Sequence, residues 1–192
     1  MIDYKKIIQS LCYIGGKCRG RRMSKIHALK VIYLADRYHL RMFGSTITGD
    51  SYWAMPMGPV ASSTKKVIEG SAADKDIAAY ALDYILPGKD RYQSKIVTTF
   101  DELAKTDIEA LDAAYDAYLD KAPENIVTYT HRFPEWHKHQ ARLDAGASRV
   151  KMSMLDFFEP SMYPRDEYCP APEEQVSLNR EIYLDTPECL RT

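Results

Sequence analysis

The chain has 192 residues, which is enough for one well-buried core with a modest appendage. Its hydrophobic content of 45% and charged content of 28% are those of a globular protein and exclude a disordered or fibrous chain. The sequence contains no run of about 20 apolar residues and lacks the order of a signal peptide, so we expect a cytoplasmic protein that does not contact a membrane.

The formal net charge of -1 conceals an uneven distribution. Residues 1–30 carry eight Lys/Arg against one acidic residue, a charge of +7. Residues 101–124 carry eight acidic residues against two lysines, a charge of -6. We interpret these stretches as two solvated faces that partly neutralise each other, and a charged partner surface is the alternative.

Two helices are predicted in the first 44 residues. Asp3 caps the first, and Gly15-Gly16 ends it. Ser24 caps the second, which ends at Gly44, since glycine readily adopts a left-handed C-terminal cap. The apolar side chains of this second helix fall on one broad arc. The polar residues opposite this arc are His27, Lys30, Arg37 and His39.

Asp36 lies inside the apolar arc of the second helix. A bare carboxylate in a low-dielectric core would cost several kcal/mol, so Asp36 must be paired or accept several hydrogen bonds. We interpret Asp36 as a buried polar anchor, and His131 as a second one. An acid/base pair formed by Asp36 and His131 is the alternative.

A short extended segment, Tyr52–Met55, follows the second helix and is closed by Pro56, and Gly58-Pro59 introduces another helix. This region holds a dense group of aromatic and thioether side chains. The group consists of Tyr52, Trp53, Met55 and Met57. If exposed, these residues are adaptable anchors for a protein partner, and the alternative is that Trp53 and its neighbours fill the core.

The remaining chain predicts one hairpin and further helices. Residues 77–98 contain two β-prone runs around the turn sequence PGKD, which predicts a β-hairpin. Thr106 and Glu109 form a capping box for a helix that ends at Pro123. Another helix starts near Asn125, and residues 135–143 are helical again.

These elements predict an α+β fold that is mainly α: a compact helical domain with a small β-hairpin or wing and a short extended segment after the long second helix. The domain spans residues 1–159. Five of the ten prolines lie between Pro160 and Pro187, which indicates a Pro-rich tail over residues 160–192 that is partly helical or disordered.

The sequence contains none of the motifs HExxH, GxSxG, GxxxxGK or GxGxxG. The histidines at positions 131, 137 and 139 lack a matching Glu or Cys pattern, and the four cysteines form no CxxC pair. We therefore expect no catalytic residues, no metal and no other cofactor, and predict a binding protein rather than an enzyme.

A second hypothesis concerns nucleic acid. The basic turn KCRGRR and the residues after it offer Arg19, Arg21, Arg22 and Lys25 as phosphate contacts. A helix followed by a hairpin wing also resembles winged-helix DNA-binding proteins. Because the overall charge is slightly negative and no predicted helix has a basic outer face, nucleic-acid binding ranks below protein binding.

The same residues carry a family resemblance. The shared signature comprises Tyr33-Leu34-Ala35, His39-Leu40, Gly44, Asp50, Trp53-Ala54 and Gly58-Pro59-Val60. A second match comprises Thr130-His131, Pro134 and Trp136. In this order they resemble the Panacea domain, also called the SocA-like antitoxin domain, over roughly residues 3–158.

The resemblance implies a mostly helical fold with a small β element and a role as the antitoxin of a type II toxin–antitoxin pair in bacteria or their phages. It implies a cognate toxin protein as the partner, neutralised by direct binding. It also implies that a cellular protease is a further partner if the domain acts as an adaptor. A regulator from a phage or mobile element that binds nucleic acid through the basic turn is the alternative.

Overall fold

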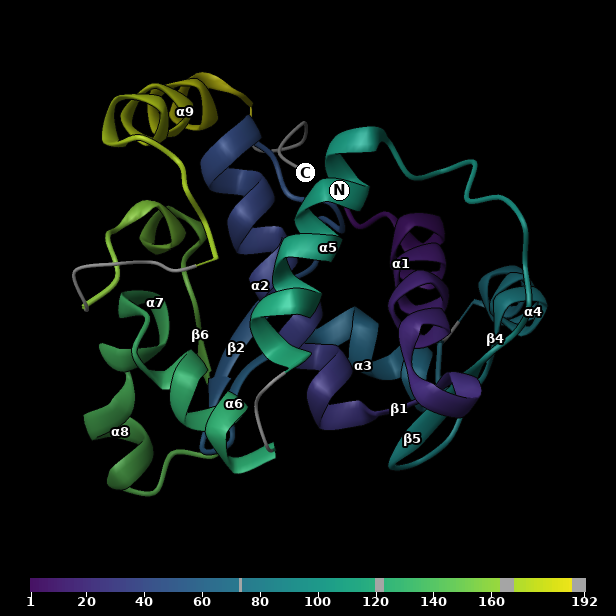
Figure 1. The fold of residues 1–192 in the computed structure, drawn as a ribbon. Coiled ribbons are helices and arrows are strands. Elements are labelled where there is room, and N and C mark those ends of the chain that lie inside the picture. Colours follow the sequence, from purple (N-terminus) through teal and green to yellow (C-terminus); the bar gives the residue numbers. More distant parts are fainter. Residues whose placement is uncertain (73, 120–122, 163–167, 188–192) are drawn as a thin grey trace.

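The computed structural model describes residues 1–72, 74–119, 123–162 and 168–187 (Figure 1). The fold is α+β and mainly helical, which confirms the prediction. The helices are α1 (Tyr4–Lys17), α2 (Lys25–Phe43), α3 (Ser62–Ile68), α4 (Lys75–Tyr84), α5 (Lys105–Leu119), α6 (Pro123–His131), α7 (Pro134–His137), α8 (Gln140–Asp144) and α9 (Glu173–Asp185), with 3-10 turns η1 (Arg19–Arg21) and η2 (Met154–Phe158). The strands are β1 (Arg22–Ser24), β2 (Tyr52–Met55), β3 (Gly58–Ala61), β4 (Ile85–Leu86), β5 (Arg91–Ser94) and β6 (Val150–Lys151). Among the described helices, none is long and apolar enough to cross a membrane.

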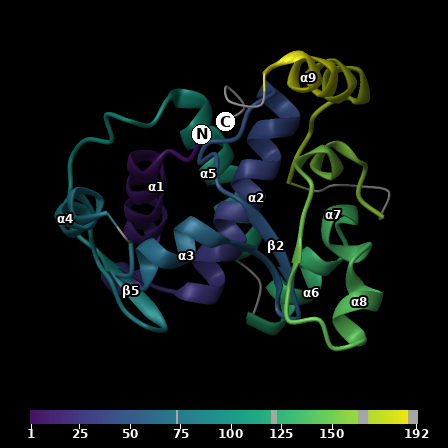
Figure 2. The same ribbon diagram turned by 180° about the vertical axis from the view of Figure 1, so that it is seen from behind.

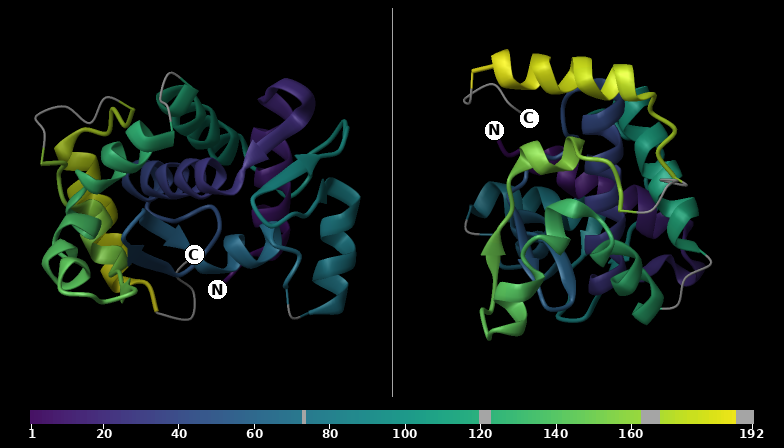
Figure 3. Two further views of the ribbon diagram at one scale, coloured as in Figure 1. Left: turned by 90° about the horizontal axis from the view of Figure 1, so that it is seen from below. Right: turned by 90° about the vertical axis from the view of Figure 1, so that its left-hand side faces the viewer.

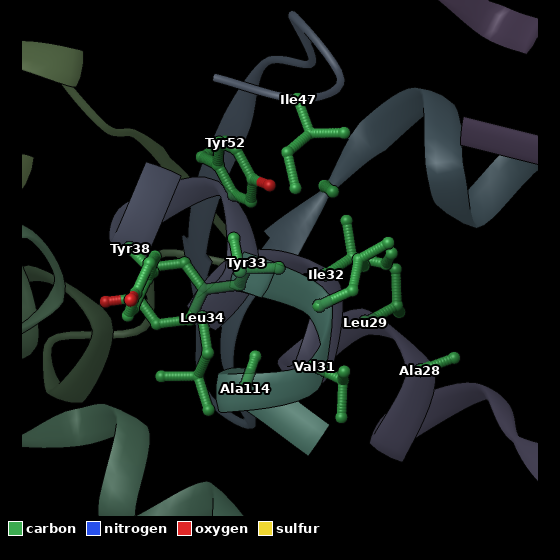
Figure 4. Close-up of a cluster of buried hydrophobic side chains, with 14 of the residues drawn as sticks. Ala28, Leu29, Val31, Ile32, Tyr33, Leu34, Tyr38, Ile47, Tyr52 and Ala114 are labelled. Carbon is green, nitrogen blue, oxygen red and sulfur yellow. The ribbon is translucent and has the colours of Figure 1, made fainter. Parts of the chain in front are cut away.

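Helix α2 forms the centre of the fold. Helices α1 and α4 lie on one side of it, and α6, α7 and α8 lie on the other (Figures 1 and 2). Every residue from Ala28 to Arg41 is buried. The side chains of α2 point away from the helix in several directions, toward Tyr52 and Ile47 on one side and toward Ala114 of α5 on another (Figure 4).

The predicted caps of the first two helices are confirmed. The Asp3 carboxylate accepts a hydrogen bond from the Lys6 N–H at 2.9 Å, and the Ser24 hydroxyl accepts one from the His27 N–H at 3.3 Å. Gly44 ends α2 with a φ of 80°, a conformation that costs other residues free energy. Helix α1 continues through its two glycines to Lys17, one residue beyond the predicted end.

The polar side of α2 is not solvated, contrary to the simple amphipathic pattern. Lys30, Arg37 and His39 are 1%, 0% and 6% exposed. Each reaches a partner from a distant part of the chain: Lys30 donates to the Pro59 carbonyl, Arg37 to Glu135, and His39 lies 3.2 Å from Asp107. Burial of these groups is possible because each has such a partner.

A buried ion pair joins α2 to α7. Arg37 Nε donates to Glu135 Oε1 at 2.9 Å, both side chains are fully buried, and the Tyr33 hydroxyl donates to the same carboxylate. Burial raises the pKa of Glu135, and the neighbouring Arg37 opposes that rise. The segment around α7 is therefore held to the core by charge as well as by packing.

The strands form two antiparallel three-stranded sheets, ordered β1–β5–β4 and β3–β2–β6. The predicted hairpin of residues 77–98 is partly wrong, because only Ile85–Leu86 and Gln93–Ser94 pair across the turn. Residues 75–84 form α4 instead, since the Asp74 carboxylate accepts hydrogen bonds from the N–H groups of Asp76 and Ile77 and caps a helix there.

Two further boundaries differ from the prediction. Gly58-Pro59 begins strand β3, and the helix after it starts only at Ser62. Helix α5 starts at Lys105 rather than at a Thr106 cap, because the Asp107 carboxylate accepts a hydrogen bond from the Ala104 N–H at 2.9 Å. That contact is the return half of a capping box, placed two residues before the expected one.

The basic and acidic stretches do neutralise each other in part, as predicted. Three lysines of α1 pair with carboxylates that lie in or just before α5. The pairs are Lys5 with Glu102, Lys6 with Asp107, and Lys17 with Asp112. Asp120 and Lys121 of the acidic stretch lie outside the described residues.

Part of the Pro-rich tail packs on the domain. Helix α9 lies across the C-terminal end of α2 (Figure 3), and its Val176 and Tyr183 join the hydrophobic core. Asn179 Nδ2 donates to the Arg41 carbonyl at 2.8 Å, which satisfies one of the free carbonyls at the end of α2. Residues 163–167 and 188–192 of the predicted tail lie outside the described residues.

Removing the carboxylate of Glu135 tests the buried pair. We expect Glu135→Ala to lower the free energy of unfolding by about 3–5 kcal/mol, because it removes the carboxylate that accepts from Arg37 Nε in the core. The double variant Arg37→Met/Glu135→Leu should lose less than Glu135→Ala, since it buries no charge at all. Urea unfolding followed by circular dichroism measures both, and a double variant as unstable as Glu135→Ala would contradict this account.

Candidate functional site

The Asp36 carboxylate fixes the chain between α2 and the β2–β3 hairpin. It is fully buried and accepts hydrogen bonds from the N–H groups of Ile47 and Thr48 at 2.8 and 3.1 Å. The hydroxyls of Thr48 and Tyr52 also donate to it, the latter at 2.7 Å. Burial raises the pKa of Asp36 to about 6, although these four donors favour its charged form. One side chain thus determines where the hairpin starts.

A second carboxylate holds the start of α3, which directly follows the second strand of the hairpin. Asp50 Oδ1 accepts from the N–H of Ser63, and Asp50 Oδ2 accepts from both the N–H and the hydroxyl of Thr64, at 2.7–2.9 Å. This carboxylate caps the start of α3. The hairpin is therefore fixed at both of its ends by buried acids.

Strand alternation divides the aromatic and thioether group into two sets. Tyr52 and Ala54 point into the core and are 1% and 0% exposed. Trp53 and Met55 point outward and are half-buried. Tyr52 was predicted as a binding residue with Trp53, Met55 and Met57, but it belongs to the core, because adjacent side chains of a strand lie on opposite faces.

The outward set forms an apolar surface that we call the hairpin face: Trp53, Met55, Met57 and Val60. Met57 is the most exposed of them, at 58%. Between the hairpin and the first turn of α2 lies a cavity of about 340 Å³. Its apolar lining comes from Ile26, Leu29, Met55, Pro56, Met57 and Val60. Exposed methionines beside a hollow are typical of adaptable protein-binding surfaces.

Cations surround the hairpin face. Lys65 and Lys66 of α3 line a second cavity of about 310 Å³ together with Arg149, whose guanidinium lies 4.5 Å from the Trp53 ring centroid. Lys151 lies opposite Trp53 on β6. Within the described residues none of these four cations forms a salt bridge. No sequence pattern indicates this rim, because Arg149 and Lys151 are brought beside Trp53 only by the pairing of β2 with β6.

The underside of the hairpin rests on Lys30. Its Nζ atom donates to the Pro59 carbonyl at 2.8 Å, and burial lowers its pKa to about 7. A Cβ atom on Gly58 would lie 2.6 Å from this Nζ and 2.9 Å from the Thr130 hydroxyl. With a φ of +90°, Gly58 is required both by its conformation and by this close approach.

The second part of the signature supports the hairpin from α6 and α7. The His131 ring stacks on Trp136 with centroids 3.5 Å apart, and Trp136 Nε1 donates to the Met55 carbonyl at 3.0 Å. Burial, with Lys30 and His137 nearby, lowers the pKa of His131 to about 4, so the stacked ring is neutral at pH 7. Trp136, which is 81 positions from Met55 in the chain, thus supports the turn at Met55.

Asp36 and His131 do not form the acid/base pair considered as an alternative. Asp36 is bound by Ile47, Thr48 and Tyr52, whereas His131 stacks on Trp136. The described residues also contain no group of three or more His, Cys, Asp or Glu side chains that could hold a metal ion. Cys12 and Cys18 are free thiols, and Cys189 lies outside the described residues.

Two of the four cations predicted as phosphate contacts, Arg21 and Lys25, have partners within the fold. Arg21 donates to the carbonyls of Ser94 and Lys95, and Lys25 forms an ion pair with Glu69 at 2.6 Å. Both cations therefore have structural partners. Arg19 and Arg22 remain exposed.

Substitution of Asp36 tests its role as an anchor. Asp36→Ala leaves two N–H groups and two hydroxyls without their acceptor, and each unsatisfied buried donor costs about 1–3 kcal/mol. We expect it to lower the free energy of unfolding by at least about 3 kcal/mol, and Asp36→Asn to cost less because its amide oxygen still accepts. Urea unfolding measures both. The exposed Asp83→Ala should change stability by less than about 0.5 kcal/mol, and an equal loss there would contradict the anchor role.

The depressed pKa of Lys30 predicts a pH dependence. Between its folded pKa of about 7 and the ordinary value of 10.5, the unfolded chain binds a proton that the folded chain has lost. Stability therefore rises with pH in this window, by up to about 1.4 kcal/mol per pH unit. We expect Lys30→Met to flatten that rise in urea unfolding between pH 7 and about 9.5, and the exposed Lys66→Met to leave it unchanged. An unaltered rise in Lys30→Met would show that another group causes it.

Comparison with known proteins gives one match. The family model described as "Antitoxin SocA-like, Panacea domain" matches residues 29–137, which is more than half of the chain. No curated protein and no solved structure matches it. The matched region contains Asp36, Lys30, the whole β2–β3 hairpin and the stacked pair of His131 and Trp136. The chain therefore belongs to the SocA-like antitoxin family, the Panacea domain.

Proposed function

We propose that the protein is the antitoxin of a type II toxin–antitoxin pair and neutralises its toxin by binding it directly at the hairpin face. Membership of the SocA-like antitoxin family supports the antitoxin role. The observation that supports this particular surface is the exposed apolar set around Met57, which stands on a buried framework and beside an apolar cavity.

The framework and the surface have separate tasks. Lys30 holds the hairpin backbone at Pro59, Asp36 holds the inward side chain of Tyr52, and Asp50 holds the start of α3 after the hairpin. None of these contacts uses the outward side chains of Trp53, Met55 and Met57. A fixed backbone with exposed apolar side chains loses little conformational entropy on binding. Such a surface is suited to tight capture of a partner.

The charge of the rim defines the toxin segment that fits. Lys65, Lys66, Arg149 and Lys151 surround the apolar centre, and the single carboxylate lining these cavities, Glu69, is paired with Lys25. The complementary segment carries an apolar side chain for the cavity beside Met57 and carboxylates on either side of it. Association should therefore be accelerated by charge and weakened by salt.

The test uses the protein encoded by the gene next to this one as the candidate toxin. We expect its expression to stop growth, co-expression of this chain to restore growth, and the two purified proteins to bind without any protease. Met57→Asp should weaken binding by at least about 30-fold in calorimetry, because it places a charge at the apolar centre of the interface. Lys65→Glu/Lys66→Glu should weaken binding and abolish growth rescue.

Met162→Asp is the matched control, since Met162 is similarly exposed at 54% but lies away from the hairpin. It should bind and rescue like the unaltered protein. Full rescue by both hairpin-face variants would exclude this surface as the toxin site. Failure of the unaltered chain to bind or rescue would exclude the neighbouring protein as its toxin and, with it, this function.

A further inference from the structure

The outer face of sheet β1–β5–β4 gathers cations that are far apart in the sequence. Arg22 on β1 lies opposite Gln93 on β5, and Arg91 lies two residues along the same strand. Their side chains point away from the core, because the alternate residues Met23 and Tyr92 point into it and are 2% and 1% exposed. Arg22, Arg91 and Gln93 line one hollow of about 270 Å³.

Further cations extend this face beyond the hollow. Lys95 follows β5 on the same side of the strand as Arg91 and Gln93, and Lys89 lies in the turn before it. Arg19 precedes β1. All three are exposed. We call this set the basic sheet face: Arg19, Arg22, Lys89, Arg91 and Lys95.

The basic sheet face is not neutralised as α1 is. Within the described residues none of its five cations forms a salt bridge, whereas three lysines of α1 are paired with carboxylates in or beside α5. Asp90 is the only acidic residue in the segments 19–24 and 85–95. The surface therefore has an excess of positive charge that is not neutralised by salt bridges within the described residues.

The chemistry of this face favours phosphate over an acidic protein surface. Arginines recognise phosphate through paired N–H donors, and Arg22 and Arg91 flank one hollow with the amide of Gln93 between them. Arg91, Gln93 and Lys95 recur every second residue, about 6.8 Å along a strand, which equals the rise over two phosphates of one nucleic-acid strand. The face offers no aromatic anchor, because Tyr92 is buried.

We propose that the basic sheet face binds the phosphate backbone of a nucleic acid, with Arg22 and Arg91 holding one phosphate in the hollow between them. Lys95, Lys89 and Arg19 contact phosphates on either side. This surface is distinct from the hairpin face, which belongs to the other sheet. Its activity does not depend on capture of a toxin.

The experiment measures binding of the full chain to fluorescently labelled duplex DNA, and separately to single-stranded RNA, by anisotropy at several salt concentrations. We expect micromolar binding at 50 mM salt that weakens steeply as salt rises, as is usual for phosphate contacts. Arg22→Gln/Arg91→Gln/Lys95→Gln should weaken binding at least about tenfold and reduce the slope of log K against log salt by about 3.

The control variant is Lys105→Gln/Arg142→Gln/Arg180→Gln, which removes the same charge from exposed positions on α5, α8 and α9. It should bind nucleic acid like the unaltered chain. An equal loss in the control, or no binding of either nucleic acid, would overturn the proposal.

Competition experiments distinguish other ligands of this face. If polyglutamate competes as effectively as nucleic acid, the face binds an acidic protein. If inorganic phosphate alone competes, the face is a simple anion site. The sheet variant should still rescue growth from the toxin, which separates this result from the proposed function.

Discussion

Helix α2 is buried on every side from Ala28 to Arg41, although this stretch carries five Asp, Lys, Arg or His side chains: Lys30, Asp36, Arg37, His39 and Arg41. Taking such groups out of water is costly unless each is paired or hydrogen-bonded. Their partners come from several other parts of the fold: the hairpin, the first turn of α5, helix α7 and the turn η2. Each of these elements must therefore lie where it can pair with a buried polar side chain of α2. The apolar core fills the space between these contacts.

The pairing of buried polar groups involves only the inner side of the hairpin, which leaves its outer side available to bind a partner. The inward residues of β2 complete the core, and Tyr52 at the same time satisfies Asp36. Because neighbouring side chains on a strand face opposite ways, Trp53 and Met55 lie on the outer face and are only half-buried. The same alternation operates in the other sheet, where Tyr92 is inside and Arg91 outside. Each sheet therefore has one face that belongs to the fold and one that is open to a partner.

Much of the fold follows from local patterns in the sequence. Spacing and composition were sufficient to predict the helix caps at Asp3, Ser24 and Gly44. They also predicted the burial of Asp36, the extended run from Tyr52 and the neutralisation of α1 by the acidic stretch. The burial of Arg37 could not be predicted in this way, because its partner Glu135 is 98 residues away. Residues 77–84 were assigned to a strand since a short apolar run fits either state, and the cap at Asp74 was the available signal for a helix. At the candidate site, the apolar group was evident from the sequence, whereas its inward and outward members and the basic rim required the pairing of the strands.

The long reach of the contacts made by α2 has a consequence for synthesis of the chain on the ribosome. Arg37 can form its ion pair only after Glu135 has been synthesised. Arg41 Nη1 can donate to the carbonyls of Phe158 and Glu159 only after those residues, 117 and 118 positions later, have been added. At an elongation rate of 5–20 residues per second, α2 is exposed for about 5–25 s before the groups that allow its burial have been made. Native burial of α2 is thus a late event, and the nascent chain presents its central helix, which is buried from Ala28 to Arg41 in the folded protein, to chaperones and proteases until nearly the whole domain has emerged.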